Sequence, residues 1–443
     1  MSVTDLILTA VILSLVPVCF IRPWIGVLVW TWIGLMNPHK LSWGFAYSFP
    51  FALIVAVATL AGTLRTRDHR PFPRTAGVYL LFALWGVFCL STFYAINPDG
   101  AWDQLDKVSK IFLMTLLAMK LLQDPKKVRA LLWIIALSVG YYGVKGGIWS
   151  LLRGSQNPVL GPPGSFMSGN TEIGLALNVV LPILVFLRRE DRRPWARLGL
   201  LAAIVLCPVA ILGTYSRGAF LGLGVVLFLL LVKARRKVLV LAAVGVALFV
   251  ATAFLPEKWF ERMETIQTYE ADSSAVARLQ TWELSLMIGR DRPLLGAGFR
   301  PFTLETYKRY MPEYPMMHRD RLHDAHSIFF QVLAEHGFIG LALYVGLLLA
   351  TWWRLRSLRR RTRGDPAQRW IFNCCDMLEV SLAGYVVCGI FLSLSYFDLY
   401  YYIVAIPSIL TALIETQERR RDGGAAEGAG PPVLARRELS EVR

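Results

Sequence analysis

The sequence predicts an all-α polytopic membrane protein. Hydrophobic residues occupy 55% of the 443 positions, and the mean hydropathy is +0.48, which is more apolar than an average soluble domain. Apolar runs recur along almost the whole chain, and a helix that crosses a bilayer needs roughly 20 such residues. The net charge of +16 comes from basic residues in short loops between these runs. That placement orients a membrane protein and requires no nucleic-acid partner.

Candidate membrane spans follow one another up to residue 415, and they predict about 12 or 13 transmembrane helices. A break at Arg22-Pro23 near the start is compatible with two spans, or with one span and a re-entrant segment. The candidate spans are residues 5–21, 23–36, 46–64, 76–93, 108–123, 128–150, 170–187, 197–213, 216–232, 238–255, 327–353, 377–395 and 400–415.

The connections between the spans alternate in charge from residue 46 onward. One set is rich in Lys and Arg, for example RTRDHRPFPR (65–74) and RLRSLRRRTRGDPAQR (354–369), whereas the other set, for example SYFDLY (395–400), is poor in them. Short basic loops stay on the cytoplasmic side. We therefore expect the second set, which includes the long loop 256–325, to face outward.

Five regions follow from this topology. The outer loop contains the amphipathic stretch ARLQTWELSLMIGR, which predicts short helices, and the C-terminal tail is polar and predicts disorder. The regions are N-terminal transmembrane helices (1–125), central transmembrane helices (126–255), a large outer loop with short amphipathic helices (256–325), C-terminal transmembrane helices (326–415) and a disordered cytoplasmic tail (416–443).

Cationic side chains stand on the outward side, where the charge rule disfavours them. Arg217 lies in TYSRGAF at the outer end of span 216–232, Arg278 lies in ARLQTW within the outer loop, and Lys145 lies near the outer end of 128–150. The guanidinium group matches the oxygens of a phosphate with two parallel donors. These residues therefore fit an anionic ligand at the outer surface, and snorkelling towards lipid head groups is the alternative.

The stretch HDAHSIFFQVLAEHGFIG places His323, Asp324 and His326 just before a long apolar run. A metal site would need a third ligand from elsewhere, and the HExxH pattern is absent. A proton relay in a transporter would lie near the membrane midplane on interrupted helices. A single histidine titrates near neutrality and can take the proton of a hydroxyl, which favours a catalytic base over these two, with a structural histidine as the remaining alternative.

The order His326-Ser327, nine residues, Gly337, two residues, Gly340 resembles the signature of bacterial O-antigen ligases. The stretches SRGAF, ARLQTW and PLLGAGFRPF are similar to the rest of the O-antigen ligase/polymerase superfamily core and occur in the same order. The resemblance covers roughly residues 165–400, with the large loop in the same place.

This resemblance implies a GT-C-type glycosyltransferase in the bacterial inner membrane with a periplasmic active site. It would transfer O-antigen from undecaprenyl diphosphate to lipid A-core oligosaccharide without a metal or any other cofactor, because the lipid diphosphate is already an activated leaving group. By position, His326 corresponds to the general base, and Arg217 and Arg278 to the residues that bind the diphosphate. Further candidate substrate-binding residues are Lys145, Asn170, Tyr215, His323 and Asp398.

The acceptor stays open at this point. The N-terminal segment RPWIGVLVWTWIGLMNPHK (22–40) is similar to O-glycosylation ligases that are associated with exosortase systems. An O-antigen polymerase would share the donor and extend another lipid-linked glycan, and a protein O-oligosaccharyltransferase would use a Ser or Thr hydroxyl. A transporter of polyprenyl-linked glycans is the non-enzyme alternative.

Overall fold

The computed structural model describes residues 3–66, 70–153, 157–234, 273–313 and 322–428, together with residues 237 and 245. Within these residues the chain forms α-helices and short 3₁₀ helices, and no strand. Eight of the described helices are long and apolar enough to cross a membrane. The chain is therefore an all-α polytopic membrane protein, as its hydropathy predicts.

Every candidate span overlaps a helix except 238–255, of which only residue 245 is among the described residues. The helices are α1 (Val3–Ile21), α2 (Pro23–Met36), α3 (Phe51–Arg65), α4 (Ala76–Phe93), α5 (Pro98–Leu121), α6 (Pro125–Arg153), α7 (Asn170–Glu190), α8 (Pro194–Leu212), α9 (Arg217–Val232), α12 (Ser273–Asp291), α13 (Leu304–Tyr310), α15 (Ile328–Arg361), α16 (Arg369–Gly389) and α17 (Asp398–Gly428), with 3₁₀ helices η1 (Pro38–Leu41), η2 (Phe45–Tyr47) and η4 (Pro366–Gln368).

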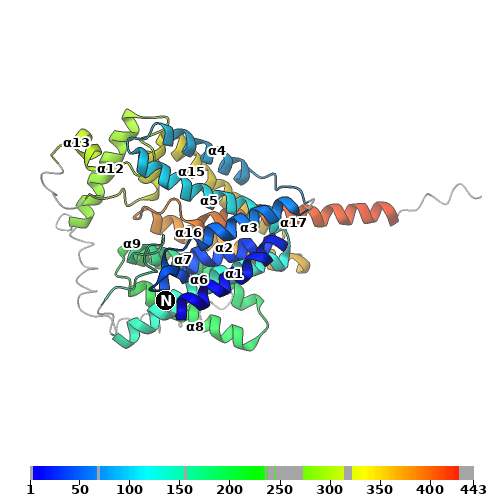
Figure 1. The fold of residues 1–443 in the computed structure, drawn as a ribbon. Helices are drawn as coiled ribbons and strands as arrows, with labels where there is room; N and C mark the ends of the chain where they lie inside the picture. Colours follow the sequence, from blue (N-terminus) through cyan, green and yellow to red (C-terminus); the bar gives the residue numbers. More distant parts are fainter. Residues whose placement is uncertain are drawn as a thin grey trace, which may run out of the picture.

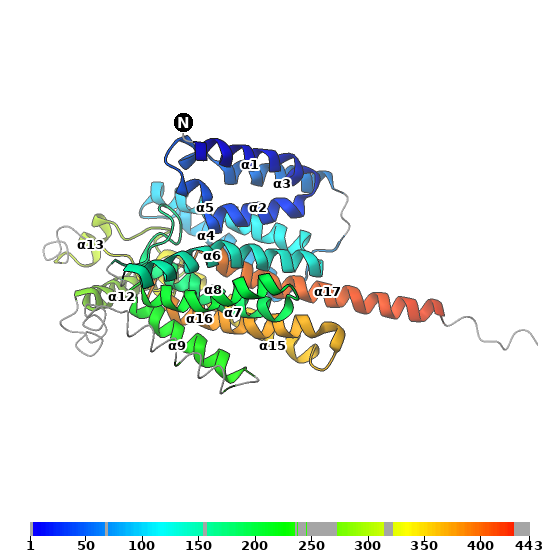
Figure 2. The ribbon, with the colours of Figure 1, turned by 90° about the horizontal axis from the view of Figure 1, so that it is seen from below.

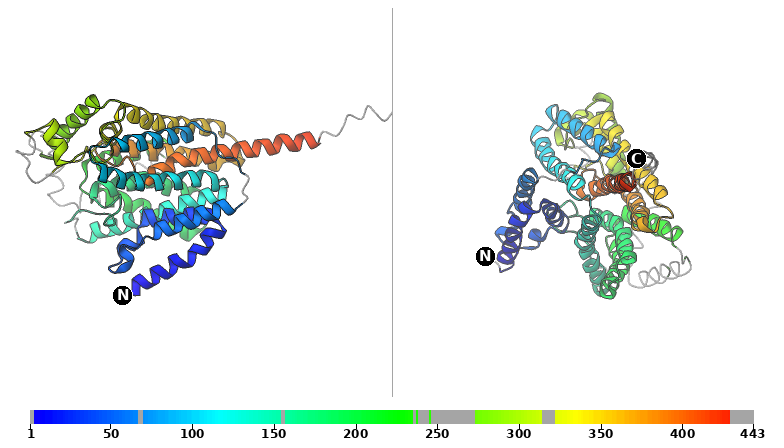
Figure 3. Two further views of the ribbon diagram at one scale, coloured as in Figure 1. Left: turned by 45° about the horizontal axis from the view of Figure 1, so that its top comes forward. Right: turned by 90° about the vertical axis from the view of Figure 1, so that its right-hand side faces the viewer.

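The long helices lie side by side in one bundle (Figure 1). Helices α12 and α13 gather at one end, and the C-terminal part of α17 extends beyond the other end. Seen from below, α1 and α9 lie at opposite edges (Figure 2). The end-on view in Figure 3 shows α17 in the middle of the bundle, and α17 is the most buried of the eight candidate spans.

The break at Arg22-Pro23 separates two helices, α1 and α2, of which α1 is among the helices long and apolar enough to span a membrane. Helix α2 begins at Pro23, whose fixed φ and missing N–H suit the first helical turn. It ends at Asn37, which adopts the left-handed conformation with φ 48°. Helices α1, α2 and α3 pack against one another, so both short apolar runs contribute to the same N-terminal layer.

Two boundaries differ from the hydropathy-based prediction in ways that matter for the site. Helix α5 begins at Pro98, with the Asn97 side chain accepting a hydrogen bond from the Gly100 N–H at 3.3 Å. Residues 98–107, predicted to be part of a loop, are thus helical. Helix α16 ends at Gly389, so the last part of the predicted span 377–395 is a loop instead.

The predicted disordered tail is helical in its first part. Helix α17 continues to Gly428, so residues 416–428 extend the helix beyond the bundle. Residues 429–443 lie outside the described residues. The Glu, Arg and Ala residues of this stretch favour a helix and proline is absent, whereas Gly423 and Gly424 disfavour one.

Charged side chains tie α15 to α16 at the end of the bundle opposite α12. Arg359 donates hydrogen bonds to Asp376 at 2.8 Å and to Glu379 at 2.9 Å. The Glu379 side chain is only 3% exposed. A carboxylate this buried is stable only when cations compensate its charge, so this cluster holds the ends of the helices in register.

Candidate active site at the α12 end of the bundle

The segment that carries His326 is held by helix α12. The Trp282 indole N–H donates a hydrogen bond to the Ala325 carbonyl oxygen at 2.9 Å. The same indole stacks on Phe330 in α15, with ring centroids 4.9 Å apart. His326 itself has φ 46°, a conformation that few residues other than glycine adopt and that often marks functional sites.

The surroundings of His326 favour its neutral form. Burial lowers the pKa of the imidazole, and the nearby Arg278 guanidinium lowers it further, whereas the Asp324 carboxylate raises it. The His323 ring lies 6.2 Å away, centroid to centroid. Since a neutral imidazole can accept a proton and a protonated one cannot, the site presents a base next to a fixed positive charge.

Arg217 is the first residue of α9 and follows a constrained turn. Tyr215 has φ 58°, and the Ser216 hydroxyl accepts a hydrogen bond from the Ala219 N–H at 3.2 Å. The Asn170 side chain donates to the Thr214 carbonyl oxygen at 2.8 Å. A guanidinium at a helix N-terminus combines two sources of positive potential, which suits an anion.

The loop 390–397 between α16 and α17 connects these two parts of the site. A Cβ added to Gly218 would lie 3.2 Å from Phe391, so the start of α9 packs on this loop. The Ser395 hydroxyl donates to the Ile328 carbonyl oxygen at 2.9 Å, so the start of α15 packs on it as well. Residues 217 and 326 therefore flank one loop.

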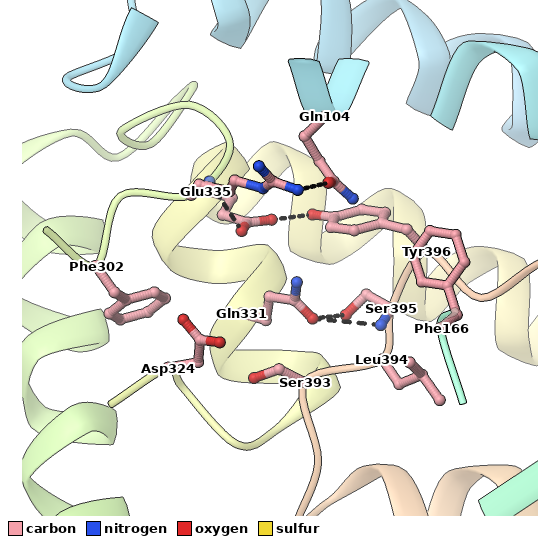
Figure 4. A pocket seen from close by; sticks show the side chains of 11 residues that line it. Gln104, Phe166, Phe302, Asp324, Gln331, Glu335, Ser393, Leu394, Ser395 and Tyr396 are labelled. Carbon is pink, nitrogen blue, oxygen red and sulfur yellow. Dashed lines mark hydrogen bonds between the residues drawn. The ribbon is translucent and has the colours of Figure 1, made fainter. Parts of the chain in front are cut away.

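A cavity of about 150 Å³ lies beside the His326 segment (Figure 4). We call it the Arg300 cavity. Its lining includes Asp324 but not His326, Arg278 or Arg217. It is lined by Gln104, Phe166, Arg300, Phe302, Asp324, Gln331, Glu335, Ser393, Leu394, Ser395 and Tyr396.

Arg300 links helices α5 and α15 at this cavity. Its backbone, at φ 52°, donates from N–H to the Glu335 carboxylate at 3.2 Å. Its guanidinium donates to the Gln104 side-chain oxygen at 2.8 Å. The Tyr396 hydroxyl donates to the other Glu335 oxygen and lies 2.9 Å from the His336 ring nitrogen. Residues from α5, α15 and two loops thus form one polar network.

A kink in α15 explains the glycine of the sequence motif. Gly337 has φ 65° and ψ −167°, a combination open to almost no other residue. An added Cβ would stand 2.6 Å from the Pro293 carbonyl oxygen. That oxygen accepts the Phe338 N–H at 2.8 Å, and the Gly298 N–H donates to the Glu335 carbonyl oxygen at 2.9 Å. The Gly-rich turn thereby fastens Arg300 to α15.

The remaining predicted residues fall into separate places. His323 stays with His326, and its carbonyl oxygen accepts the Tyr307 hydroxyl at 2.7 Å. Lys145 is exposed and lines a different cavity with Tyr142 and Trp149. Asp398 is buried and lines a neighbouring cavity, described below.

Sequence reasoning missed much of the Arg300 cavity. Arg300 lies inside the quoted PLLGAGFRPF stretch, and Glu335 lies in AEHG, but neither position showed by itself that its side chain is part of a site. Gln104 was assigned to a loop. The signals that could have found them are a polar residue within an apolar helix and the glycine pair that closes the turn.

Two family models match parts of the chain. Residues 201–345 match the family model described as O-antigen ligase. The chain carries an O-antigen ligase family domain. This confirms the resemblance of the core, and the matched range contains Arg217, Arg278 and His326. Residues 3–191 match a family of unknown function (DUF5935). The comparison with curated proteins gave no match.

Proposed function

We propose that this protein is an O-antigen ligase, an inverting glycosyltransferase that moves O-antigen polysaccharide from undecaprenyl diphosphate to lipid A-core oligosaccharide. The observation that carries the proposal is His326, whose pKa is lowered by burial and by the nearby Arg278, inside the domain that matches O-antigen ligase. The short connections 94–97 and 390–397 at the α12 end contain no Lys or Arg, which supports a periplasmic active site in the inner membrane, because the charge rule applies to short loops.

In the proposed reaction a hydroxyl oxygen of the acceptor sugar attacks C1 of the first glycan sugar while the bond from C1 to the diphosphate oxygen breaks. His326 takes the hydroxyl proton, and the leaving diphosphate keeps the bonding electrons. Arg217 and Arg278 stabilise the charge that builds up on this leaving group, where preorganised donors act most strongly. Direct displacement inverts the configuration at C1, and the reaction needs no ATP and no metal.

The test uses the purified full chain with lipid-linked O-antigen and lipid A-core, with EDTA and without ATP. We expect transfer by the wild type and a loss of roughly 10²–10⁴-fold in His326→Ala, the usual contribution of a general base. His39→Ala is the matched control, because His39 is also a partly buried histidine whose pKa burial lowers, to about 4, but it lies in η1.

Three outcomes would contradict the proposal. Near wild-type transfer by a folded His326→Ala protein would show that His326 is not the general base. Elongation of the lipid-linked glycan alone would identify an O-antigen polymerase instead. Transfer to a Ser- or Thr-containing peptide rather than to lipid A-core would identify a protein O-oligosaccharyltransferase.

A further inference from the structure

The Arg300 cavity carries polar groups that the proposed reaction does not use. The Gln104 side-chain oxygen is occupied by Arg300, which leaves its NH₂ group to donate. The Gln331 oxygen accepts from the backbone N–H of Ser395 at 3.3 Å and lies 2.9 Å from the Ser395 hydroxyl oxygen. The Ser393 hydroxyl is enclosed and has no hydrogen-bond partner among the described residues. A buried hydroxyl without a partner is costly unless a ligand completes it.

The chemistry of the lining suits a neutral polyhydroxyl ring. Amide and guanidinium donors stand near the Asp324 carboxylate, so adjacent hydroxyl groups could both donate and accept. In Figure 4, Phe302 and Phe166 lie on opposite sides of these polar groups, which provides apolar faces for the C–H side of a sugar. A volume of about 150 Å³ exceeds the roughly 30 Å³ of one water several times. The cavity thus has room for a ring rather than for a single ion.

We infer that the Arg300 cavity binds one sugar ring of the acceptor glycan, and this inference rests on the proposed function. The acceptor fits better than the donor for two reasons. Asp324 lies two residues before His326, so a ring bound here is close to the base that takes its proton. The Asp324 carboxylate also offsets the positive charge of Arg300 in this cavity, so the cavity attracts a diphosphate less strongly than Arg217 and Arg278 do.

A neighbouring cavity of about 420 Å³ supplies an access route for a lipid-anchored acceptor. It shares Gln104, Phe166 and Arg300 with the Arg300 cavity. Its lining also includes apolar side chains of α3, such as Leu53, and the cation Lys107 of α5. An amphipathic glycolipid matches this combination of an apolar wall and a cationic rim.

The inference assigns a role to the N-terminal region of the chain. Gln104 and Phe166 belong to the segment that matches a family of unknown function, whereas Arg300 belongs to the O-antigen ligase domain. In this arrangement the acceptor ring lies between the N-terminal region and the O-antigen ligase domain. The N-terminal region therefore takes part in the choice of acceptor, while the ligase domain supplies the base and the diphosphate site.

The first experiment measures KM for each substrate with Ser393→Ala and Gln104→Ala in the full chain. Loss of one neutral hydrogen bond predicts a rise of roughly five- to ten-fold in KM for lipid A-core and no change in KM for the lipid-linked donor. Asp103→Ala is the control, because Asp103 is exposed on the same helix beside Gln104. Because the Ser393 hydroxyl bonds to no described protein group, a purely structural role predicts unchanged kinetics for Ser393→Ala.

The second experiment has a readout that does not need catalysis. Core oligosaccharide released from lipid A by mild acid is titrated into wild type and Ser393→Ala in nanodiscs, with maltohexaose as the comparison ligand. We expect saturable binding of the core oligosaccharide that Ser393→Ala weakens by the same factor. Such binding in a protein that transfers no glycan would uphold the subsite while the proposed reaction fails. An unchanged acceptor KM, or an equal rise for donor and acceptor, would overturn the inference.

Discussion

Replacement of Gly337 by alanine tests how the site is held together. Gly337 joins two segments of α15 at φ 65° and ψ −167°. An alanine Cβ would meet the Pro293 carbonyl oxygen at 2.6 Å and the Leu294 carbonyl carbon at 2.8 Å. Both atoms belong to backbone, which cannot rotate away as the end of a flexible side chain can. Either the kink or the turn at residues 293–298 must move.

Two contributions determine how much free energy of unfolding Gly337→Ala loses. A residue other than glycine in this region of φ and ψ costs of order 1–3 kcal/mol. Displacing the turn weakens the hydrogen bond from Phe338 N–H to Pro293, 2.8 Å long, whose net contribution is about 1 kcal/mol. We expect Gly337→Ala to lose roughly 2–4 kcal/mol of unfolding free energy, which for a chain of this length corresponds to a fall of roughly 2–4 °C in Tm.

The assay is thermal unfolding of the purified protein in detergent, followed by intrinsic fluorescence, with the monodisperse fraction checked by size-exclusion chromatography. Gly346→Ala is the control in the same helix, since its nearest neighbour would be Leu80 Cδ2 at 3.9 Å. Alanine is favoured over glycine within a helix by about 1 kcal/mol, so Gly346→Ala should keep or raise Tm. Equal Tm values for the two variants would refute the backbone argument.

Two further predictions concern charge. Asp324→Asn removes the charge that raises the pKa of His326, so this pKa falls further. Because the base acts only when it is neutral, the fall of kcat on acidification, measured at saturating substrates, should occur at a lower pH than in wild type. A shift of this fall to higher pH would contradict the electrostatic argument. Arg359→Ala removes a hydrogen bond to the buried Glu379 and should lower the free energy of unfolding by about 1–3 kcal/mol, measured by thermal unfolding. Arg356→Ala, at an exposed position of the same helix, should change the free energy of unfolding little. Equal effects of the two substitutions would show that the ion cluster adds no stability.

The site could be predicted in part from the sequence because catalytic motifs are local. The order of SRGAF, ARLQTW and the His326–Gly340 stretch is readable without any fold, and it led to Arg217, Arg278 and His326. In the structure Arg278 lowers the pKa of His326, and residues 217 and 326 flank the loop 390–397. The roles of all three stay predictions that the transfer assay checks.

The sequence by itself determined the class of protein and the approximate position of its helices, because burial of apolar side chains in a bilayer leaves a signal that hydropathy reads directly. Only the tertiary structure decided that residues 390–397 form a loop, since an apolar run does not reveal that Ser395 hydrogen-bonds to α15 rather than continuing a helix. It also decided that Arg300 meets Gln104, nearly two hundred positions away. Such contacts arise from how helices pack against one another, and no local pattern of residues encodes that packing.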